Sequence, residues 1–209
     1  MKFPFLASFL LFSALLTYEL RKSRKIEENS MKDFWQKERN ANSVRKKDLD
    51  SLPYVSIPFQ NLPMDALADR DEIKEIHKEL ENLSMKKIVN LTGISNTDLK
   101  LTYGTANITV LTEYDQNYTI LARTLYKWGK ILYEEKLIAQ AKQVLEFGIE
   151  TGSDVSGNYR LLAAIYKQEG KEEKIEALSQ KASTLNSLMK NSILNSLKDI
   201  CHGEESSCQ

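Results

Sequence analysis

The strongest constraint on the fold is a pattern of large and small apolar residues that recurs between Ala122 and Ser187. Corresponding positions in its two copies are thirty-four residues apart, as with Leu125 and Tyr159. Each copy has the spacing of two helices joined by a turn. The first copy consists of Leu125, Trp128, Gly129, Leu132, Ala141, Leu145 and Gly148, and the second of Tyr159, Leu162, Ala163, Tyr166, Gly170, Lys171, Ile175 and Ala182. Because one such unit buries its apolar face only against a neighbour, the period predicts a stack of helix pairs.

This stretch, and most specifically the segment LLAAIYKQEGKEEKIEAL, resembles the tetratricopeptide repeat (TPR). The resemblance implies an all-α fold in which antiparallel helix hairpins form a right-handed superhelical array. It also implies a function, the binding of another protein or peptide. We expect helices at 118–134, 137–151, 154–168 and 171–185. Two units are fewer than the three or so that a stable stack needs, so flanking helices must complete the core.

The regions on either side of residues 122–187 are predicted to supply these helices. Residues 69–121 form an N-terminal helical pair in this interpretation, with helices at 69–83 and 98–114 and a cap for the next helix at 115–117. Apolar residues at helical spacing between 188 and 200 predict a capping helix that terminates the array. Residues 201–209 are polar and are expected to form a disordered tail.

Residues 1–20 contain an uncharged apolar segment from Phe3 to Tyr18. As a helix it would extend about 24 Å, which is shorter than a hydrocarbon core of about 30 Å. A signal peptide is therefore an alternative, although no small-x-small cleavage site follows the segment. We favour an uncleaved transmembrane anchor.

The basic residues that flank this segment predict its orientation. Lys2 precedes it, whereas Arg21, Lys22, Arg24 and Lys25 follow it. The positive-inside rule then places the C-terminal domain of a single-pass cell-membrane protein in the cytoplasm. The same basic cluster could also bind anionic lipid headgroups.

The next two segments differ sharply in composition. Residues 21–48 are charged with mixed sign, which predicts a solvated juxtamembrane helix that acts as a spacer. Residues 49–68 hold three of the four prolines and many apolar side chains. Proline disfavours helix in the preceding residue, so we expect an extended arm packed on the helical domain. Two roles are open for this proline-rich arm: a cover for the core, or an internal ligand in the groove of the repeats.

Three further segments are similar to a family of bacterial single-pass membrane proteins of uncharacterised function, which carry TPR-like cytoplasmic domains. They are KKDLDSLPYVSIPFQNLP, NLTGISNTDLKLTYG and LEFGIETGSDVSGNY. Together they span most of the predicted folded region. This resemblance implies a membrane anchor and brings no established activity.

Composition and motif content argue against several other classes of function. Acidic and basic residues number 29 each, so no net charge attracts a nucleic acid. No catalytic motif is present, and neither His77 nor His202 has a titratable partner at a fixed spacing. Cys201, His202 and Cys208 lack a fourth ligand, so no metal site is predicted. No cofactor or small-molecule substrate is evident from the sequence either.

TPR domains bind peptides on the concave face lined by the first helix of each unit, and the resemblance assigns eight residues to such a peptide-binding groove. They are Arg123, Tyr126, Lys127, Lys130, Tyr133, Arg160, Ala164 and Lys167. Most of them are basic, which suits an acidic segment held by charge-assisted hydrogen bonds. The asparagine-containing carboxylate clamp of chaperone-binding members is not reproduced. A solvated basic face without a ligand is the alternative interpretation.

The leading hypothesis is a membrane-anchored adaptor that uses a helical-repeat groove for protein–protein interaction and has no enzymatic activity. The alternative is a structural subunit of a cell-envelope or secretion complex, with the repeat domain outside the cytoplasm. Membrane topology separates these two hypotheses. A third, an enzyme with an unrecognised site, would need more convergent titratable groups than the sequence contains.

Overall fold

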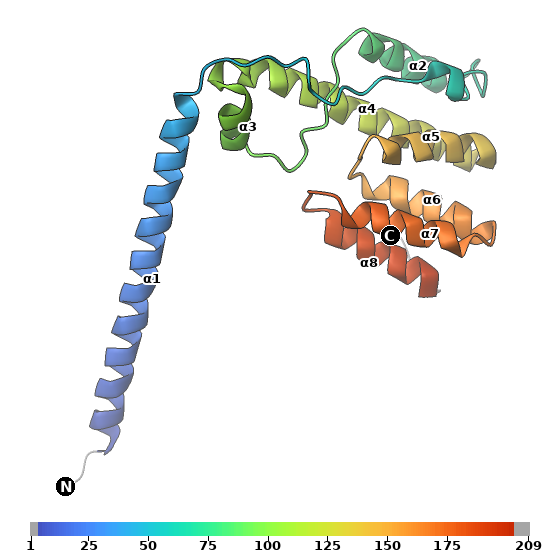
Figure 1. The fold of residues 1–209 in the computed structure, drawn as a ribbon. Coiled ribbons are helices and arrows are strands. Elements are labelled where there is room, and N and C mark those ends of the chain that lie inside the picture. Colours follow the sequence, from blue (N-terminus) through green and yellow to red (C-terminus); the bar gives the residue numbers. More distant parts are fainter. Residues whose placement is uncertain (1–3, 203–209) are drawn as a thin grey trace. The chain divides into compact units, whose positions relative to one another are not determined.

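A computed structural model describes residues 4–202, and the side chains of residues 8–201. The secondary structure of those residues is helical, as predicted, apart from an isolated antiparallel bridge between Tyr54 and Val89 (Figure 1). The elements are α1 (Pro4–Asn42), η1 (Phe59–Asn61), α2 (Asp71–Ser84), α3 (Asn96–Tyr103), η2 (Thr105–Asn107), α4 (Ile108–Glu134), α5 (Ile138–Glu150), α6 (Ser156–Gln168), α7 (Glu172–Ser183) and α8 (Lys190–His202). The chain forms two compact units, Met1–Lys47 with Ser95–Ile108 and Asp48–Ile94 with Thr109–Gln209.

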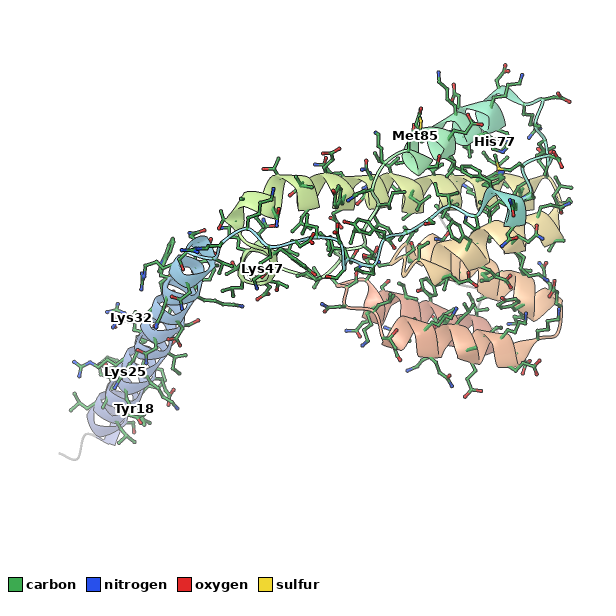
Figure 2. The ribbon with its side chains drawn as sticks, turned by 45° about the horizontal axis from the view of Figure 1, so that its top comes forward. Tyr18, Lys25, Lys32, Lys47, His77 and Met85 are labelled. Carbon is green, nitrogen blue, oxygen red and sulfur yellow. The ribbon has the colours of Figure 1, made fainter. Side chains whose placement is uncertain are left out.

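Helix α1 is continuous, so no backbone break separates the predicted anchor from the predicted spacer. Apolar side chains in its first half, among them Phe9 and Leu16, are exposed. Beyond Tyr18 the same helix carries charged side chains such as Lys25 and Lys32 (Figure 2). Among the described residues, no helix combines the length and the apolar composition that crossing a membrane requires.

In the first unit, polar and charged contacts hold the C-terminal end of α1 against α3. Glu38 accepts hydrogen bonds from Lys100 Nζ and from Thr97 Oγ1, the latter at 2.6 Å. Lys37 forms an ion pair with Asp98 at 2.7 Å. The Lys100 and Thr97 hydrogen bonds hold the pKa of Glu38 below its ordinary value. Three side-chain contacts fix α1 to α3, and Thr105 of η2 adds a hydrogen bond to the carbonyl of Ala41.

The predicted helix at 98–114 is wrong in its bounds, because the chain turns sharply at Gly104. This residue adopts a left-handed φ of 88°, which ends α3 before α4 begins. A Cβ on Gly104 would lie 2.3 Å from the carbonyl oxygen of Arg45, so a larger residue does not fit. The side-chain amide of Asn107 closes the turn by donating to the carbonyl of Lys47 at 2.7 Å. Gly104 therefore ends α3 where a helix through residue 114 had been predicted.

The predicted cap between Asp115 and Asn117 and the predicted boundary at Ala122 are also corrected, because α4 continues through both. The two polar side chains instead hold the connector that follows α2. The Asp115 carboxylate accepts a hydrogen bond from Leu91 N at 3.0 Å. The Asn117 amide donates to Lys87 O, also at 3.0 Å. Aspartate and asparagine commonly cap helices. Here both residues lie inside a helix, and their side chains bind the backbone of a neighbouring segment.

In the second unit, α2 lies antiparallel to α4 and covers one side of it (Figure 1). Arg70, just before α2, forms a 2.7 Å ion pair with Glu135, just after α4. The ring of His77 in α2 packs edge-on against Trp128 in α4, with the ring centroids 5.2 Å apart. Trp128 is completely buried. Helix α2 thus supplies one of the flanking helices that the two repeats need.

Helices α5, α6 and α7 lie within two residues of their predicted bounds. Gly129 lets α4 and α5 approach closely, because a Cβ at this position would lie 2.7 Å from Leu145 Cδ2. Helix α8 begins two residues later than predicted and packs on α6 and α7, with Ile193 and Leu197 buried. The core of the unit thus continues from α2 to α8.

Several side chains contact a residue about one repeat further along the chain. Tyr118 donates a hydrogen bond to the Thr151 carbonyl at 3.2 Å, across 33 positions. Ser187 donates to the Asp154 carboxylate at 2.5 Å, again across 33 positions. Successive turns between helices therefore lie side by side, which is typical of stacked repeats.

The proline-rich arm, residues 49–68, packs on the hydrophobic core of the second unit. Leu52 and Leu62 are buried, and most other apolar side chains of the arm are partly buried against the same core. The backbone N–H of Val55 donates to the carbonyl of Ile88 at 2.9 Å. The arm is thereby attached to the connector that follows α2.

Candidate binding surface

The residues predicted to bind a partner lie on α4 and α6, and α8 is the next helix beside α6. Near the ends of these helices, Gln168 Nε2 donates to Tyr133 Oη at 3.3 Å, across 35 positions. Lys167 Nζ donates to the carbonyl of Ile200, across 33 positions. The C-terminal ends of α4, α6 and α8 therefore lie on the same side of the unit.

Three exposed cations, Arg123, Lys127 and Lys130, follow one side of α4. We call them the basic ridge. Their spacing of four and three residues places them in one row on the helix surface, away from the buried row that contains Trp128. Lys130 lies 3.7 Å from Glu134, but their side chains are 55% and 59% exposed, so this ion pair is weak. The basic ridge therefore presents its charge to solvent.

The two predicted aromatic residues lie where α4 meets α6. Tyr126 packs over Gly157, where a Cβ would lie 2.4 Å from Cζ of the tyrosine ring. Tyr133 accepts the hydrogen bond from Gln168. Both tyrosines are partly buried.

The three predicted residues on α6 differ in their surroundings. Arg160 and Lys167 are exposed, and Ala164 is partly buried. The Lys167 ammonium meets the last turn of α8, where backbone carbonyls have no partner within the helix. The predicted groove residues therefore occupy adjacent helices, but Tyr126, Tyr133 and Lys167 contribute to contacts between those helices.

Sequence reasoning missed two residues beside the basic ridge. Ile120 is 39% exposed and precedes Arg123 by three positions, so it adds an apolar group to the same row. Gln168 connects α6 to Tyr133. Extending the row on α4 by one turn would have found Ile120, whereas the contact of Gln168 depends on how the helices pack.

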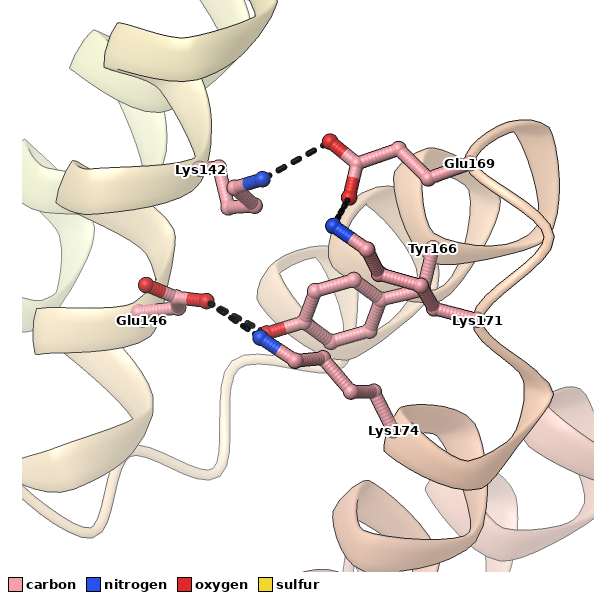
Figure 3. A network of polar contacts seen from close by, with 6 residues as sticks. All are labelled: Lys142, Glu146, Tyr166, Glu169, Lys171 and Lys174. Atoms are coloured by element: carbon pink, nitrogen blue, oxygen red, sulfur yellow. Dashed lines mark hydrogen bonds and ion pairs between the residues drawn. The ribbon is translucent and has the colours of Figure 1, made fainter.

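A second polar cluster joins α5, α6 and α7 (Figure 3). Glu169 is the centre of the first half of this cluster. One of its carboxylate oxygens lies 2.7 Å from Nζ of Lys142, and the other lies 2.7 Å from Nζ of Lys171. Hydrogen bonds from Lys142 and then Lys171 lower the pKa of Glu169 to about 2. The carboxylate therefore stays ionised at neutral pH and holds the end of α6 to α5.

The second half of this cluster surrounds Tyr166, which donates a 2.5 Å hydrogen bond to Glu146 (Figure 3). Lys174 Nζ lies 5.1 Å from the centre of the tyrosine ring and 4.0 Å from the Glu146 carboxylate. Burial, followed by the hydrogen bond to Glu146, raises the pKa of Tyr166. A tyrosine held in its protonated form is a poor acid–base catalyst. We therefore interpret this cluster as a structural connection between α5, α6 and α7.

A pocket of about 450 Å³ lies between the arm, the connector after α2 and the turns that precede α6 and α8. Both asparagine side chains that line it have partners in the fold. The amide of Asn90 donates to the carbonyls of Thr151 and Gly152, and the amide of Asn186 donates to Gly93 O. These two amides therefore connect the turns around the pocket.

In the described part of the chain, no three His, Cys, Asp or Glu side chains gather in a way that could hold a metal ion. Cys201 is exposed, while the side chains of His202 and Cys208 lie outside the described residues. Comparison of the chain with protein-family models, with curated protein sequences and with solved structures gives no match.

Proposed function

We propose that this protein is a membrane-anchored adaptor whose helical array holds an acidic segment of a partner protein on the face of α4 and α6. We further propose that the array is a TPR-like right-handed superhelix in which α4 and α5, and α6 and α7, are the two full units. The hydrogen bonds between positions 33 to 35 residues apart support this arrangement. In it, α8 takes the place of the first helix of a third unit.

The observation that carries the proposal is the basic ridge on α4. Arg123, Lys127 and Lys130 are exposed in one row, and Arg160 is exposed on the adjacent helix. The chain as a whole has no net charge, so this local excess of cations is a property of the surface and not of the composition. Carboxylates of a partner would form charge-assisted hydrogen bonds with the three cations of the basic ridge, while Ile120 supplies an apolar contact.

A binding measurement with a matched control tests this surface. A fluorescent glutamate-rich peptide is titrated with the full chain and with the triple variant Arg123→Ala, Lys127→Ala, Lys130→Ala. Each exposed ion pair contributes about 0.5 kcal/mol, so losing three should weaken binding about tenfold. The control removes three exposed lysines elsewhere on the second unit, Lys78→Ala, Lys86→Ala and Lys181→Ala. Equal loss in both variants would mean that net charge, and not the ridge, determines binding.

The proposed anchor is the apolar first half of α1, with the basic residues that follow it at the cytoplasmic surface. Its exposed apolar side chains have no described partner in the first unit beyond the helix itself, and burial in lipid would remove them from water. Leu11→Glu with Leu15→Glu should shift the full chain from the membrane fraction to the soluble fraction. Retention of this double variant in membranes would refute the anchor.

Topology decides between the adaptor and a structural subunit of a cell envelope. Reporters that are active only in the cytoplasm or only outside it are fused after Gln209. Activity of the cytoplasmic reporter supports the adaptor. Activity of the external reporter favours the envelope subunit and reverses the orientation inferred from Arg21 to Lys25.

A further inference from the structure

The last described helix ends beside the candidate binding surface. Lys167 of α6 donates a hydrogen bond to the carbonyl of Ile200, in the final turn of α8, and that helix ends at His202. The residue after Lys167 contacts Tyr133 of α4, which lies one helical turn beyond Lys130. The chain that follows His202 therefore starts at the same end of the array as the C-terminal end of the basic ridge, with α6 between them.

Residues 203–209, GEESSCQ, lie outside the described residues, and their chemistry complements the basic ridge. They contain two adjacent carboxylates, Glu204 and Glu205, and neither lysine nor arginine. Extended chain covers about 3.3–3.6 Å per residue, so three residues span about 10 Å before the glutamate side chain is counted. Neighbouring helices lie about 8–10 Å apart, so the ridge on α4, with α6 between it and α8, is about 16–20 Å from the end of α8. The extended glutamate and lysine side chains add about 10 Å to the reach of the backbone, which is then sufficient.

We propose that residues 203–209 dock on the basic ridge through Glu204 and Glu205 and compete there with the acidic partner segment. The competition rests on the proposed function, whereas the docking does not. A short tether gives the segment an effective concentration in the millimolar range at the ridge. Because two exposed carboxylates bind weakly, the segment lowers the apparent affinity for a partner several-fold and does not exclude it. Only a partner with more carboxylates, or better placed ones, displaces it.

Docking is tested without any partner by carbodiimide cross-linking of the full chain in detergent micelles. Carbodiimide activates a carboxylate, which then condenses with an amine in contact with it, so the amide bond formed reports a direct ion pair. We expect cross-links from Glu204 or Glu205 to Lys127 or Lys130, and their loss in high salt. Cross-links restricted to Lys190 and Lys198, or none from either glutamate, would overturn the proposal.

Competition is tested with the fluorescent glutamate-rich peptide described above. The variant Glu204→Gln, Glu205→Gln should bind the peptide about three- to tenfold more tightly than the unmodified chain. The control, Glu173→Gln with Glu176→Gln, removes the same charge from exposed positions on α7 and should leave the affinity unchanged. Equal affinity of the glutamine variant and the unmodified chain overturns the competition. Absence of peptide binding by every variant overturns the proposed function, while the cross-links still decide whether the segment docks.

Discussion

Each of the two hairpins, α4 with α5 and α6 with α7, has one residue with a left-handed φ in its turn. This residue is a lysine in the first hairpin and a glycine in the second, and the difference permits a sharp test of the proposed repeat. Lys136 has φ of 64° and Gly170, thirty-four positions later, has φ of 69°. Both close the same pattern of hydrogen bonds at a helix end. Lys136 N donates to Tyr133 O at 3.0 Å, and Gly170 N donates to Lys167 O at 3.1 Å. This is the hydrogen bonding of a Schellman motif, which favours glycine at that position.

Exchanging the residue type at these positions should change stability in opposite directions. A left-handed conformation costs an L-residue about 1–2 kcal/mol, whereas glycine loses about 0.5–1 kcal/mol more conformational entropy on folding. Gly170→Ala should therefore destabilise the protein by about 1 kcal/mol, and Lys136→Gly should stabilise it by up to about 1 kcal/mol. No atom lies within 4 Å of a Cβ built on Gly170, so a steric clash does not contribute to the alanine effect.

Urea unfolding of the full chain, followed by circular dichroism, measures both free energies of unfolding. Gly170→Asn is the internal control, because asparagine tolerates the left-handed region better than alanine and should cost less. A stability change of the same sign for Lys136→Gly and Gly170→Ala would refute the reasoning, as would a neutral Gly170→Ala.

Three further variants test contacts that hold the second unit together. Tyr166→Phe removes the hydrogen bond to Glu146 and should lower the free energy of unfolding by about 1 kcal/mol, with little effect on peptide binding. Asn117→Ala removes the donor to the Lys87 carbonyl from a part-buried hydrogen bond and should cost about 1 kcal/mol in the same unfolding assay; an unchanged value would contradict the role given to this amide. Burial lowers the pKa of His77 from 6.5 despite the opposing effect of Glu81, so stability should be complete above pH 6.5 and decline as the pH falls through and below that value. His77→Phe should remove this decline between pH 7 and 5, and persistence of the same slope would assign it to other groups.

Helices α5, α6 and α7 could be predicted because each carries its own signals. The buried rows through Leu125 and Leu162 recur with helical spacing, and the turns fall where a helix end needs a special residue. Local pattern also predicted an extended, packed arm, since proline excludes helix and its apolar neighbours need burial. In these regions local preference and tertiary packing favour the same structure, so pattern alone was sufficient.

Prediction was wrong where a polar or small residue serves a distant segment. Asp115 and Asn117 have the composition of a helix cap, yet they bind the connector backbone from inside a continuous helix. Gly104 falls inside the helix predicted at 98–114, but it ends α3 with a positive φ, and the backbone of Arg45 lies against it. Such roles depend on contacts between residues far apart in the chain, and no local period encodes them.

For the candidate binding surface, the sequence by itself determined which residues share one side of a helix. The basic ridge follows from the spacing of Arg123, Lys127 and Lys130 and needs only helical geometry. The tertiary structure decided which predicted residues are engaged elsewhere: Tyr126 packs over Gly157, and Lys167 meets the end of α8. The physical reason is that helical periodicity is a property of neighbouring residues, whereas availability to a ligand depends on what the adjacent helices bring against each side chain.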